Sequence, residues 1–306
     1  MTDTIIVLDG GMSRELIRIG APFQQPEWSA LALLEAPHLV KQAHQEFAAA
    51  GADVLTTNTY ALVPFHINED RFWSRGEELS ALAGQLAKEA ADAFVGKRVA
   101  GSLPPMFGSY EPALFDPTTV QSRLAVLIRG LSSHVDLWLG ETLSLIAEAE
   151  AVKWAVKESG KPLWISFTLE DDGPQAPARL RSGESVEDAA RWSLDAGIEA
   201  LLFNCSRPEY MNAAVLEAQR VFTGMTMPED SKAPLIGVYG NAFELKSTDD
   251  AANVGISSTR KDLNAVKYSD FARQWVSSGA SIVGGCCGIG TEHIQDLSSA
   301  LKKREA

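Results

Sequence analysis

The three cysteines are the residues of this chain whose type and placement are best suited to chemistry. Cys205 lies in the segment FNCS, and Cys286 and Cys287 are adjacent in the segment IVGGCCG of the 306-residue sequence. Both segments contain short apolar runs that predict buried β-strands, with the cysteines at the strand ends. Three thiolates that converge there can hold zinc and leave its fourth position open. An all-sulfur ligand set favours zinc or another soft metal over magnesium or calcium.

The adjacency of Cys286 and Cys287 sets a condition on the backbone. Neighbouring side chains of a β-strand point to opposite faces of the sheet, so adjacent cysteines in a regular strand cannot reach one ion. We therefore expect the strand to end before Cys286 and the backbone to turn there. The flanking glycines allow φ and ψ values that other residues avoid, and we also expect them to leave space around the metal.

Two other interpretations of these segments stay open on the residues alone. A single cysteine such as Cys205 is most often a small buried apolar residue. The segment GGCCGIG could instead cradle a phosphate with its backbone N–H groups, as the loops after strands seven and eight of many barrels do. The chain would then be a phosphate-binding lyase or isomerase in which the cysteines take no part.

Polar residues follow several of the other apolar runs. Asp9 and Glu141 are acids at the ends of predicted strands, where a buried carboxylate needs a cation or hydrogen-bond donors. Together they could hold a substrate ammonium group, whereas Asp9 by itself could cap the turn that follows it. Thr57 and Asn204 also lie at strand ends, although such side chains often bond to loop backbone.

Eight short runs rich in β-forming residues recur through the sequence, most of them separated by segments with helical periodicity. The runs begin at Ile5, Asp53, Arg98, Val135, Leu163, Glu199, Pro234 and Ser281. Their nearly continuous apolar character is typical of parallel strands buried on both faces. Gly51, Gly160, Gly197 and Gly279 stand between a helix and the next strand, where a left-handed glycine cap is common. Eight such units predict a single (β/α)₈ barrel over residues 1–306.

A doubly wound open sheet is the alternative to the barrel. Against it, the loop after the first strand, LDGGMSRE, lacks the GxGxxG pattern of a dinucleotide-binding fold. In a barrel the active site lies at the carboxyl ends of the strands, which is where the cysteines and the polar residues above are expected. Residues 171–185 and 241–263 are predicted to be long loops on that side.

Composition limits the classes of partner. The net charge is −13, from 27 basic and 40 acidic residues, so there is no basic surplus to bind nucleic acid. No apolar stretch reaches the ~18 residues of a membrane span, and the first residues lack the basic region of a signal peptide. We therefore expect no nucleic-acid or membrane partner and a cytoplasmic location with free thiols. A homo-oligomer is compatible with the sequence.

The chain resembles the zinc-dependent homocysteine S-methyltransferases in the motifs LDGGMSREL, WSALALLEAPHLVKQAHQEFAAAGADVLTTNTY, GET, FNCS and GGCCG followed by EHI. The similarity runs from the first predicted strand to the last, and GGCCG with an upstream NC is its most specific part. The resemblance implies a (β/α)₈ enzyme in which Cys205, Cys286 and Cys287 hold zinc. It also implies that Asp9 and Glu141 bind the amino group of homocysteine.

The same resemblance implies further substrate contacts. Thr57 and the backbone near Gly10 would receive the carboxylate of homocysteine, and Asn204 would belong to the same substrate shell. In a chain of this length we do not expect the folate and cobalamin modules of the large methionine synthases. We therefore expect S-methylmethionine or S-adenosylmethionine as the methyl donor, in preference to betaine. Residues 239–241 read YGN where the family often has YPN, so the donor side is the part that the resemblance leaves open.

Overall fold

The computed structural model describes residues 5–225, 232–244 and 259–302. Within them the chain forms one sheet of eight parallel strands in the order β1-β8-β7-β6-β5-β4-β3-β2. The strands are β1 (Ile6–Val7), β2 (Val54–Thr56), β3 (Arg98–Leu103), β4 (Leu137–Leu143), β5 (Leu163–Phe167), β6 (Ala200–Asn204), β7 (Leu235–Tyr239) and β8 (Ile282–Val283). Each lies within one of the eight runs that the sequence predicts.

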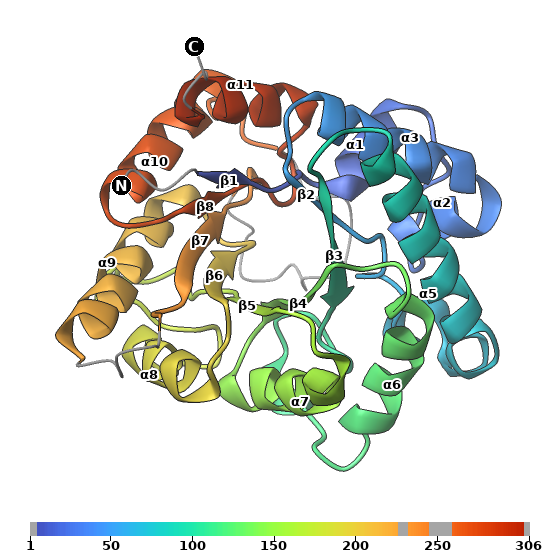
Figure 1. Ribbon diagram of the computed structural model, residues 1–306, viewed down its shortest axis with the longest axis horizontal. Helices are drawn as coiled ribbons and strands as arrows, with labels where there is room; N and C mark the ends of the chain where they lie inside the picture. The colour runs from blue at the N-terminus through green and yellow to red at the C-terminus, as the bar shows by residue number, and fades with distance from the viewer. Residues whose placement is uncertain (1–4, 226–231, 245–258, 303–306) are drawn as a thin grey trace.

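The sheet closes on itself, which distinguishes a barrel from an open sheet. Ile6 of β1 pairs with Ile282 of β8, so the first and last strands are neighbours. On the other side of β1, Leu8 forms a parallel bridge to Val54 of β2. The strands therefore form a ring around a central axis, as seen in Figure 1. The (β/α)₈ barrel is confirmed, and the doubly wound alternative is wrong.

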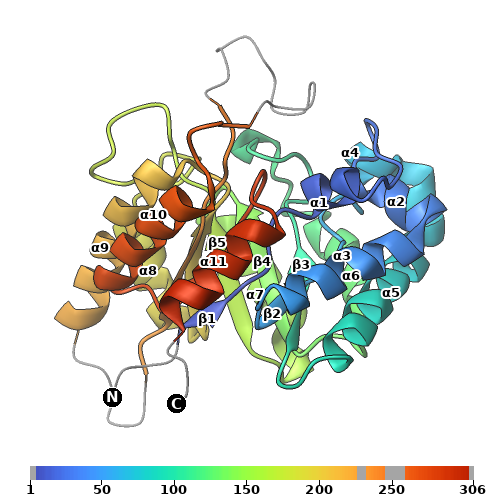
Figure 2. The same ribbon diagram turned by 90° about the horizontal axis from the view of Figure 1, so that it is seen from above.

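Helices surround the barrel and connect its strands (Figures 1 and 2). The α-helices are α1 (Met12–Arg18), α2 (Ser29–Glu35), α3 (Pro37–Ala49), α4 (Pro64–Ile67), α5 (Glu69–Asp92), α6 (Val120–Leu131), α7 (Ile146–Val156), α8 (Val186–Ala196), α9 (Pro208–Gly224), α10 (Ala265–Ser277) and α11 (Thr291–Leu301). Short 3₁₀ turns follow at η1 (Pro112–Leu114) and η2 (Lys157–Ser159). Among these described helices, none has the length and apolarity that crossing a bilayer requires.

The glycines between helices and strands have the backbone conformation that the sequence predicts. Gly160 and Gly197 are left-handed caps with φ of 64° and 65°, and Gly51 and Gly279 have φ of 107° and 119°. A side chain would strain the backbone at such φ values. These four positions let the chain leave a helix and enter the next strand within a few residues.

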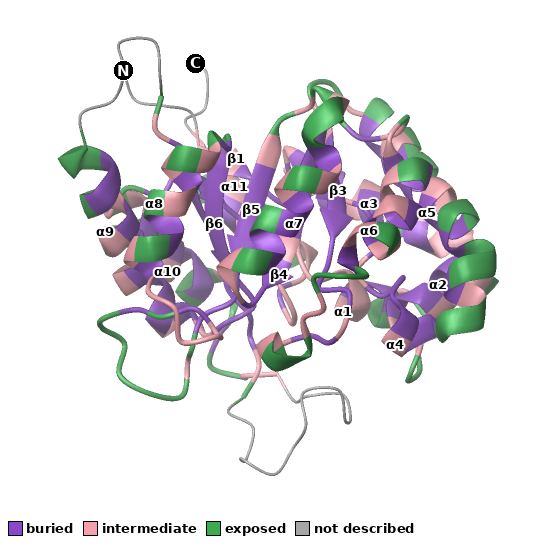
Figure 3. Cartoon of the chain, turned by 90° about the horizontal axis from the view of Figure 1, so that it is seen from below, coloured by how far each residue is buried: buried purple, intermediate pink, exposed green. Residues whose placement is uncertain are grey.

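The core has two layers, and both are dense. The larger lies between the sheet and the helices, and most strand residues are buried (Figure 3). The smaller fills the barrel interior, where Trp164 is fully buried, donates to the Glu199 carboxylate at 2.5 Å and lies under the Arg98 guanidinium. Arg98 begins β3 and Glu199 precedes β6, so this group closes the amino end of the barrel. The active site is therefore expected at the carboxyl ends of the strands.

The predicted loop at residues 171–185, and the described ends of the one at residues 241–263, lie on that carboxyl side. In the loop at residues 171–185, Leu180 bridges to Leu169, which precedes the loop, and Arg179 bridges to Ser185 at its end. Of the other loop, residues 245–258 lie outside the described residues, and its two described ends are joined by a bridge between Phe243 and Thr259.

Candidate metal and substrate site

The backbone turns at the two adjacent cysteines as the sequence requires. β8 ends at Val283, and the following segment is held by three N–H donations: Gly284 to Val238, Gly285 to Asp9 and Cys286 to Gly240, each at 3.0 Å to the carbonyl oxygen. A turn follows at residues 287–288, where Gly288 has a φ of 84°. Cys286 and Cys287 therefore lie outside the strand, where neighbouring side chains need not point to opposite faces of the sheet, and both can face one point.

The flanking glycines help the two cysteines to face one point in a different way from the one expected. Only Gly288 uses a positive φ. A Cβ on Gly285 would lie 2.1 Å from the Ile289 side chain, and one on Gly11 would lie 2.6 Å from the Cys286 carbonyl oxygen. These glycines permit close packing between the loop after β1 and the cysteine segment. They position the cysteines through that packing. The expectation that every flanking glycine supplies a turn conformation is therefore wrong.

The three sulfur atoms come together at the carboxyl ends of β6 and β8. Cys205 follows β6 directly and has a φ of 50°, and its sulfur lies 3.8 Å from that of Cys287. The sulfurs of Cys205, Cys286 and Cys287 all lie within 4.8 Å of one another. Two sulfurs that each bind a tetrahedral zinc at ~2.3 Å are separated by ~3.8 Å. The donor set therefore fits a soft tetrahedral metal.

The electrostatics of the thiols also favour a bound cation. Contacts with Cys286 and Cys287, together with a hydrogen bond from Tyr110, hold the pKa of Cys205 well below its usual value. The contact with Cys205 raises the pKa of both Cys286 and Cys287, because a second buried thiolate would lie beside the first. A cation bound among the three sulfurs would favour the ionised form of all of them.

Asp9 lies at the end of the segment that follows β1 and is almost fully buried. Its carboxylate accepts hydrogen bonds from the Thr56 N–H at 2.7 Å and the Thr56 hydroxyl at 3.0 Å. Cap bonds to the turn after Asp9 were the alternative, and the bonds instead cross to β2. Burial raises the pKa of Asp9 to about 8 despite these donors, and the nearby Glu141 carboxyl adds to the rise.

Glu141 lies within β4 and faces the same region. Its carboxylate accepts a hydrogen bond from the Ser102 hydroxyl at 2.5 Å. Burial raises the pKa of Glu141 to about 7, and the charge of Cys205 contributes to the rise. Asp9, which is buried, and Glu141, which is half-buried, thus form a pair of carboxyls near the sulfurs, and such a pair is stabilised when a cation enters between them.

Thr57 and Asn204 hold their neighbours by hydrogen bonds. The Thr57 hydroxyl lies 2.9 Å from that of Thr59 and accepts the Ser102 N–H at 3.0 Å, so it fixes the residue that in turn holds Glu141. The Asn204 amide accepts from Ser166 at 2.8 Å and donates to the Thr142 hydroxyl at 2.8 Å.

Asn204 and Gly10 complete the set of predicted residues. The Asn204 amide nitrogen lies 3.9 Å from the Cys286 sulfur, so this side chain reaches the cysteine cluster. Gly10 packs so tightly that a Cβ would lie 2.4 Å from the Ile289 carbonyl oxygen. No acceptor for the Gly10 N–H occurs among the described residues, and this donor is free to meet a substrate.

The phosphate interpretation of GGCCGIG fits the structure poorly. Most of the N–H groups in the segment already donate within the protein, namely those of Gly284, Gly285, Cys286, Ile289 and Gly290. A phosphate cradle depends on several N–H groups that point at the anion without another acceptor. The N–H groups of this segment instead hold the two cysteines in position.

Sequence reasoning missed Tyr110 as part of the site. Its hydroxyl donates to the Cys205 sulfur at 2.9 Å, and the residue has a φ of 64°. Tyr110 lies in the irregular loop between β3 and α6, where neither periodicity nor spacing singles out one residue. The Tyr239 hydroxyl is also buried near Glu141.

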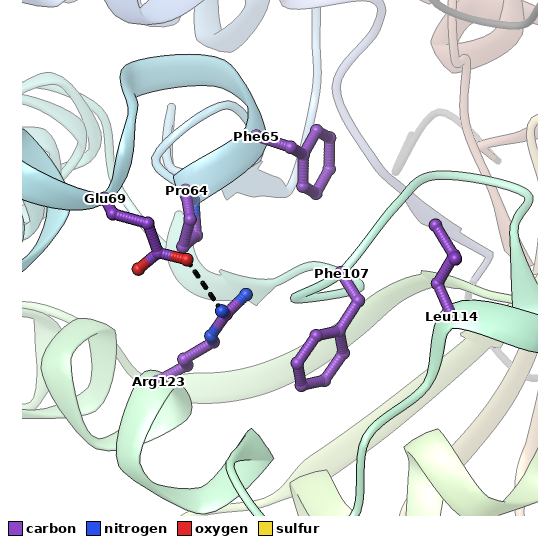
Figure 4. A pocket seen from close by; sticks show the side chains of 6 residues that line it. All are labelled: Pro64, Phe65, Glu69, Phe107, Leu114 and Arg123. Carbon is purple, nitrogen blue, oxygen red and sulfur yellow. Dashed lines mark hydrogen bonds and ion pairs between the residues drawn. The ribbon is translucent and has the colours of Figure 1, made fainter.

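A separate surface pocket of about 350 Å³ lies beside the barrel mouth (Figure 4). Arg123 crosses it, with an ion pair to Glu69 at 2.8 Å and its guanidinium over the Phe107 ring. The pocket is lined by Pro64, Phe65, Glu69, Phe107, Leu114 and Arg123. It contains none of the residues that the sequence proposes for chemistry, so the active site is assigned by the cysteine cluster and not by this cavity.

Comparison with known proteins agrees with the geometry. The profile of the homocysteine S-methyltransferase family matches residues 6–301. Homocysteine S-methyltransferase 1 of Brassica oleracea var. italica is 30% identical, and the alignment covers 97% of this chain and 94% of that protein. Homocysteine S-methyltransferase YbgG of Bacillus subtilis (strain 168) is 28% identical over 97% of this chain and 95% of its own.

A solved structure shares the fold. The metallated form of the homocysteine methyltransferase MmuM from Escherichia coli superimposes with a TM-score of 0.76 at 24% identity, covering 97% of this chain and 96% of that chain. The family match over nearly the whole chain, together with the barrel and its cysteine cluster, leads to one assignment. The chain belongs to the homocysteine S-methyltransferase family and is an enzyme that transfers a methyl group to homocysteine.

Proposed function

We propose that this enzyme transfers a methyl group from a sulfonium donor to the thiolate of L-homocysteine, giving methionine, with zinc held by Cys205, Cys286 and Cys287. The observation that carries the proposal is the convergence of three sulfur atoms within 4.8 Å of one another. When bound, the zinc would deprotonate the substrate thiol, whose ordinary pKa near ~8.5 leaves little thiolate at neutral pH.

The residues around the sulfurs would hold the amino-acid part of homocysteine. The ammonium group goes to Asp9 and Glu141, whose buried carboxyls gain a counter-charge on binding. The carboxylate goes to the Gly10 N–H, which has no acceptor among the described residues. Thr57 contributes if its hydroxyl turns away from Thr59, to which it lies hydrogen-bonded at 2.9 Å. Asn204 keeps the end of β6, and with it Cys205, in place.

The transfer step requires alignment and the exclusion of water. The homocysteine sulfur attacks the methyl carbon of the donor in line, so that a new carbon–sulfur bond forms as the old one breaks. The electron pair of the broken bond stays on the donor sulfur, which leaves as a neutral thioether. No proton moves in this step, because the thiol proton was released on binding. The buried surroundings of Asp9, Glu141 and Cys205 keep water from the nucleophile.

A panel of labelled donors tests the proposal. Zinc-loaded enzyme is incubated with homocysteine and S-methylmethionine, S-adenosylmethionine or betaine, each carrying a ¹³C methyl group, and labelled methionine is measured. We expect label from one or both sulfonium donors, and none from the Cys287→Ser enzyme. Label from betaine alone would overturn the donor class, and no label from any donor would overturn the proposed reaction.

A further inference from the structure

Tyr110 makes a direct contact with the cysteine cluster that the proposed reaction does not use. Its hydroxyl donates to the Cys205 sulfur at 2.9 Å, which is close for a sulfur acceptor because sulfur is larger than oxygen. The residue belongs to residues 104–119, between β3 and α6, and reaches the end of β6 from there. The Cys205 sulfur, at the end of β6, is therefore held by a hydrogen bond from the loop that follows β3.

The backbone at Tyr110 is strained to make this contact. Its φ of 64° lies in the left-handed region, which a bulky residue seldom adopts. Such outliers persist where the surrounding structure over-determines them, and they gather at functional sites. Cys205 and Thr142, both at the same barrel mouth, also have positive φ values of 50° and 59°. The site thus concentrates strained residues around the sulfur that Tyr110 contacts.

Other side chains fix the ring and its loop. The Arg181 guanidinium lies 5.3 Å from the centroid of the Tyr110 ring, and Arg181 is itself held by an ion pair with Asp171 at 3.1 Å. Next to Tyr110, the Ser109 hydroxyl lies 2.8 Å from that of Tyr60. Tyr110 is therefore held by contacts with two neighbouring loops: Arg181 of the loop after β5 lies over its ring, and Tyr60 of the loop after β2 bonds to the adjacent Ser109.

A purely structural explanation accounts for only part of this arrangement. A buried tyrosine hydroxyl needs a hydrogen-bond partner for stability, and any backbone carbonyl would satisfy it without a strained φ. The partner found here is one of the three sulfur atoms of the cluster. A hydrogen bond to such a sulfur acts on both its position and its charge, as outer groups do for metal ligands in general.

We propose that Tyr110 is a positioning residue of the metal centre, whose hydroxyl fixes the Cys205 side chain and withdraws negative charge from its sulfur. This inference rests on the proposed metal centre and extends it. With one sulfur less electron-rich, the centre attracts the incoming homocysteine thiol more strongly and favours its thiolate form at lower pH. Tyr110 acts through Cys205 and does not itself touch the reacting atoms.

Cobalt substitution gives a readout that loop packing alone would not change. Wild type, Tyr110→Phe and Tyr60→Phe proteins are loaded with Co²⁺, and the sulfur-to-cobalt charge-transfer absorption is recorded. Loss of the Tyr110 hydrogen bond raises the energy of the sulfur lone pairs, so we expect the band of Tyr110→Phe to shift to longer wavelength. Zinc affinity, measured by competition with a chromophoric chelator, should fall about 10- to 100-fold.

Tyr60→Phe is the matched control, because it removes a half-buried hydroxyl bonded to the same loop but not to sulfur. It should leave the charge-transfer band in place, and an equal shift in this variant would overturn the inference. Replacement of Tyr110 by 3-fluorotyrosine keeps the shape and strengthens the donor, so the band should move to shorter wavelength. This second replacement decides the question if Tyr110→Phe does not fold.

The outcomes separate this inference from the proposed function. If both Tyr110 replacements show the same charge-transfer band and the same zinc affinity as wild type, the proposed role of Tyr110 is overturned. The proposed metal centre would then still stand. A wild-type protein that binds Co²⁺ without any sulfur charge-transfer band would overturn the metal centre and this inference together.

Discussion

The sulfur of Cys205 lies 3.8 Å from that of Cys287, although 82 positions separate the two residues in the chain. The strand order produces this proximity, because only β7 separates β6 from β8 in the sheet and the carboxyl ends of parallel strands lie on the same side. The spacing equals that of two sulfurs on one tetrahedral zinc at ~2.3 Å. The fold thus places thiols from two strand ends at a single metal-sized point.

Loss of either adjacent cysteine should remove the metal. A serine hydroxyl at position 286 or 287 does not ionise as a thiol does, so Cys286→Ser and Cys287→Ser should each retain little zinc after dialysis. Activity should fall by more than the roughly 10- to 100-fold that is typical of residues which only support a ligand. Elemental analysis measures the zinc, and circular dichroism checks the fold. Stoichiometric zinc in the double variant would show that the metal binds elsewhere.

The carboxyl pair should act on homocysteine binding. Asp9→Asn and Glu141→Gln each remove a charged contact worth about 1.5–3 kcal/mol, which corresponds to a KM for homocysteine raised roughly 10- to 150-fold. The KM for the methyl donor should change much less. Steady-state kinetics with each substrate varied in turn measures the difference.

Glu148→Gln is the matched control for these two variants. Glu148 is also buried, with its pKa raised to about 7, but it accepts the N–H groups of Ser144 and Leu145 at the start of α7. Its replacement should lower the melting temperature without a selective effect on the KM for homocysteine. An equal rise of that KM in all three variants would point to general destabilisation and not to substrate contacts.

The buried acids should make the substrate-free protein less stable as pH rises. Burial raises the pKa of Asp9 to about 8 and that of Glu141 to about 7, so the native state holds protons that the unfolded chain has lost. Their stabilising effect is complete below about pH 4, where both states are protonated, and is lost as pH rises toward 8. Each group contributes a slope of about 1.4 kcal/mol per pH unit inside that window.

Urea unfolding at several pH values between 5 and 7 measures this slope. In Asp9→Asn the decline of the unfolding free energy should be shallower by about 1.4 kcal/mol per pH unit, since one titrating group is gone. The same decline in wild type and Asp9→Asn would mean that Asp9 is ionised in the native protein, contrary to the effect of burial described above.

Close packing against the cysteine segment should be sensitive to one methyl group. A Cβ at Gly11 would lie 2.6 Å from the Cys286 carbonyl oxygen, so Gly11→Ala should push this segment aside. Overpacking of this kind costs about 1–3 kcal/mol, and zinc affinity should fall with it. Gly173→Ala serves as the control, because a Cβ there meets nothing within 4 Å. Zinc affinity that is unchanged in Gly11→Ala would contradict the positioning role of this contact.

The sequence predicts the barrel and the cysteine cluster because both depend on patterns that are local. Continuous apolar runs indicate parallel strands, and the rule that barrel sites lie at strand ends brings Cys205 and Cys286 together before any coordinate is known. The left-handed conformations of Gly160 and Gly197 are predictable as well, because each glycine stands between a helix and the next strand. Such inferences need only the chain order and the geometry of one residue type.

Contacts made by irregular loops escape this reasoning. Tyr110 reaches the Cys205 sulfur across 95 positions from a segment without periodicity, so nothing near it in the sequence indicates its partner. The hydrogen bonds of Asp9 could not be assigned either, because its turn and the end of β2 both offer donors. The choice of Thr56 depends on how β1 and β2 lie side by side in the closed ring.

X-ray absorption at the zinc edge, with and without homocysteine, tests the metal–thiolate centre most directly. The spectrum of the zinc-loaded enzyme should fit three sulfur neighbours at ~2.3 Å, the usual zinc–sulfur distance, and addition of homocysteine should raise the number to four. A spectrum with fewer than three sulfur neighbours, or one that homocysteine leaves unchanged, would contradict the activation of the substrate thiol at Cys205, Cys286 and Cys287.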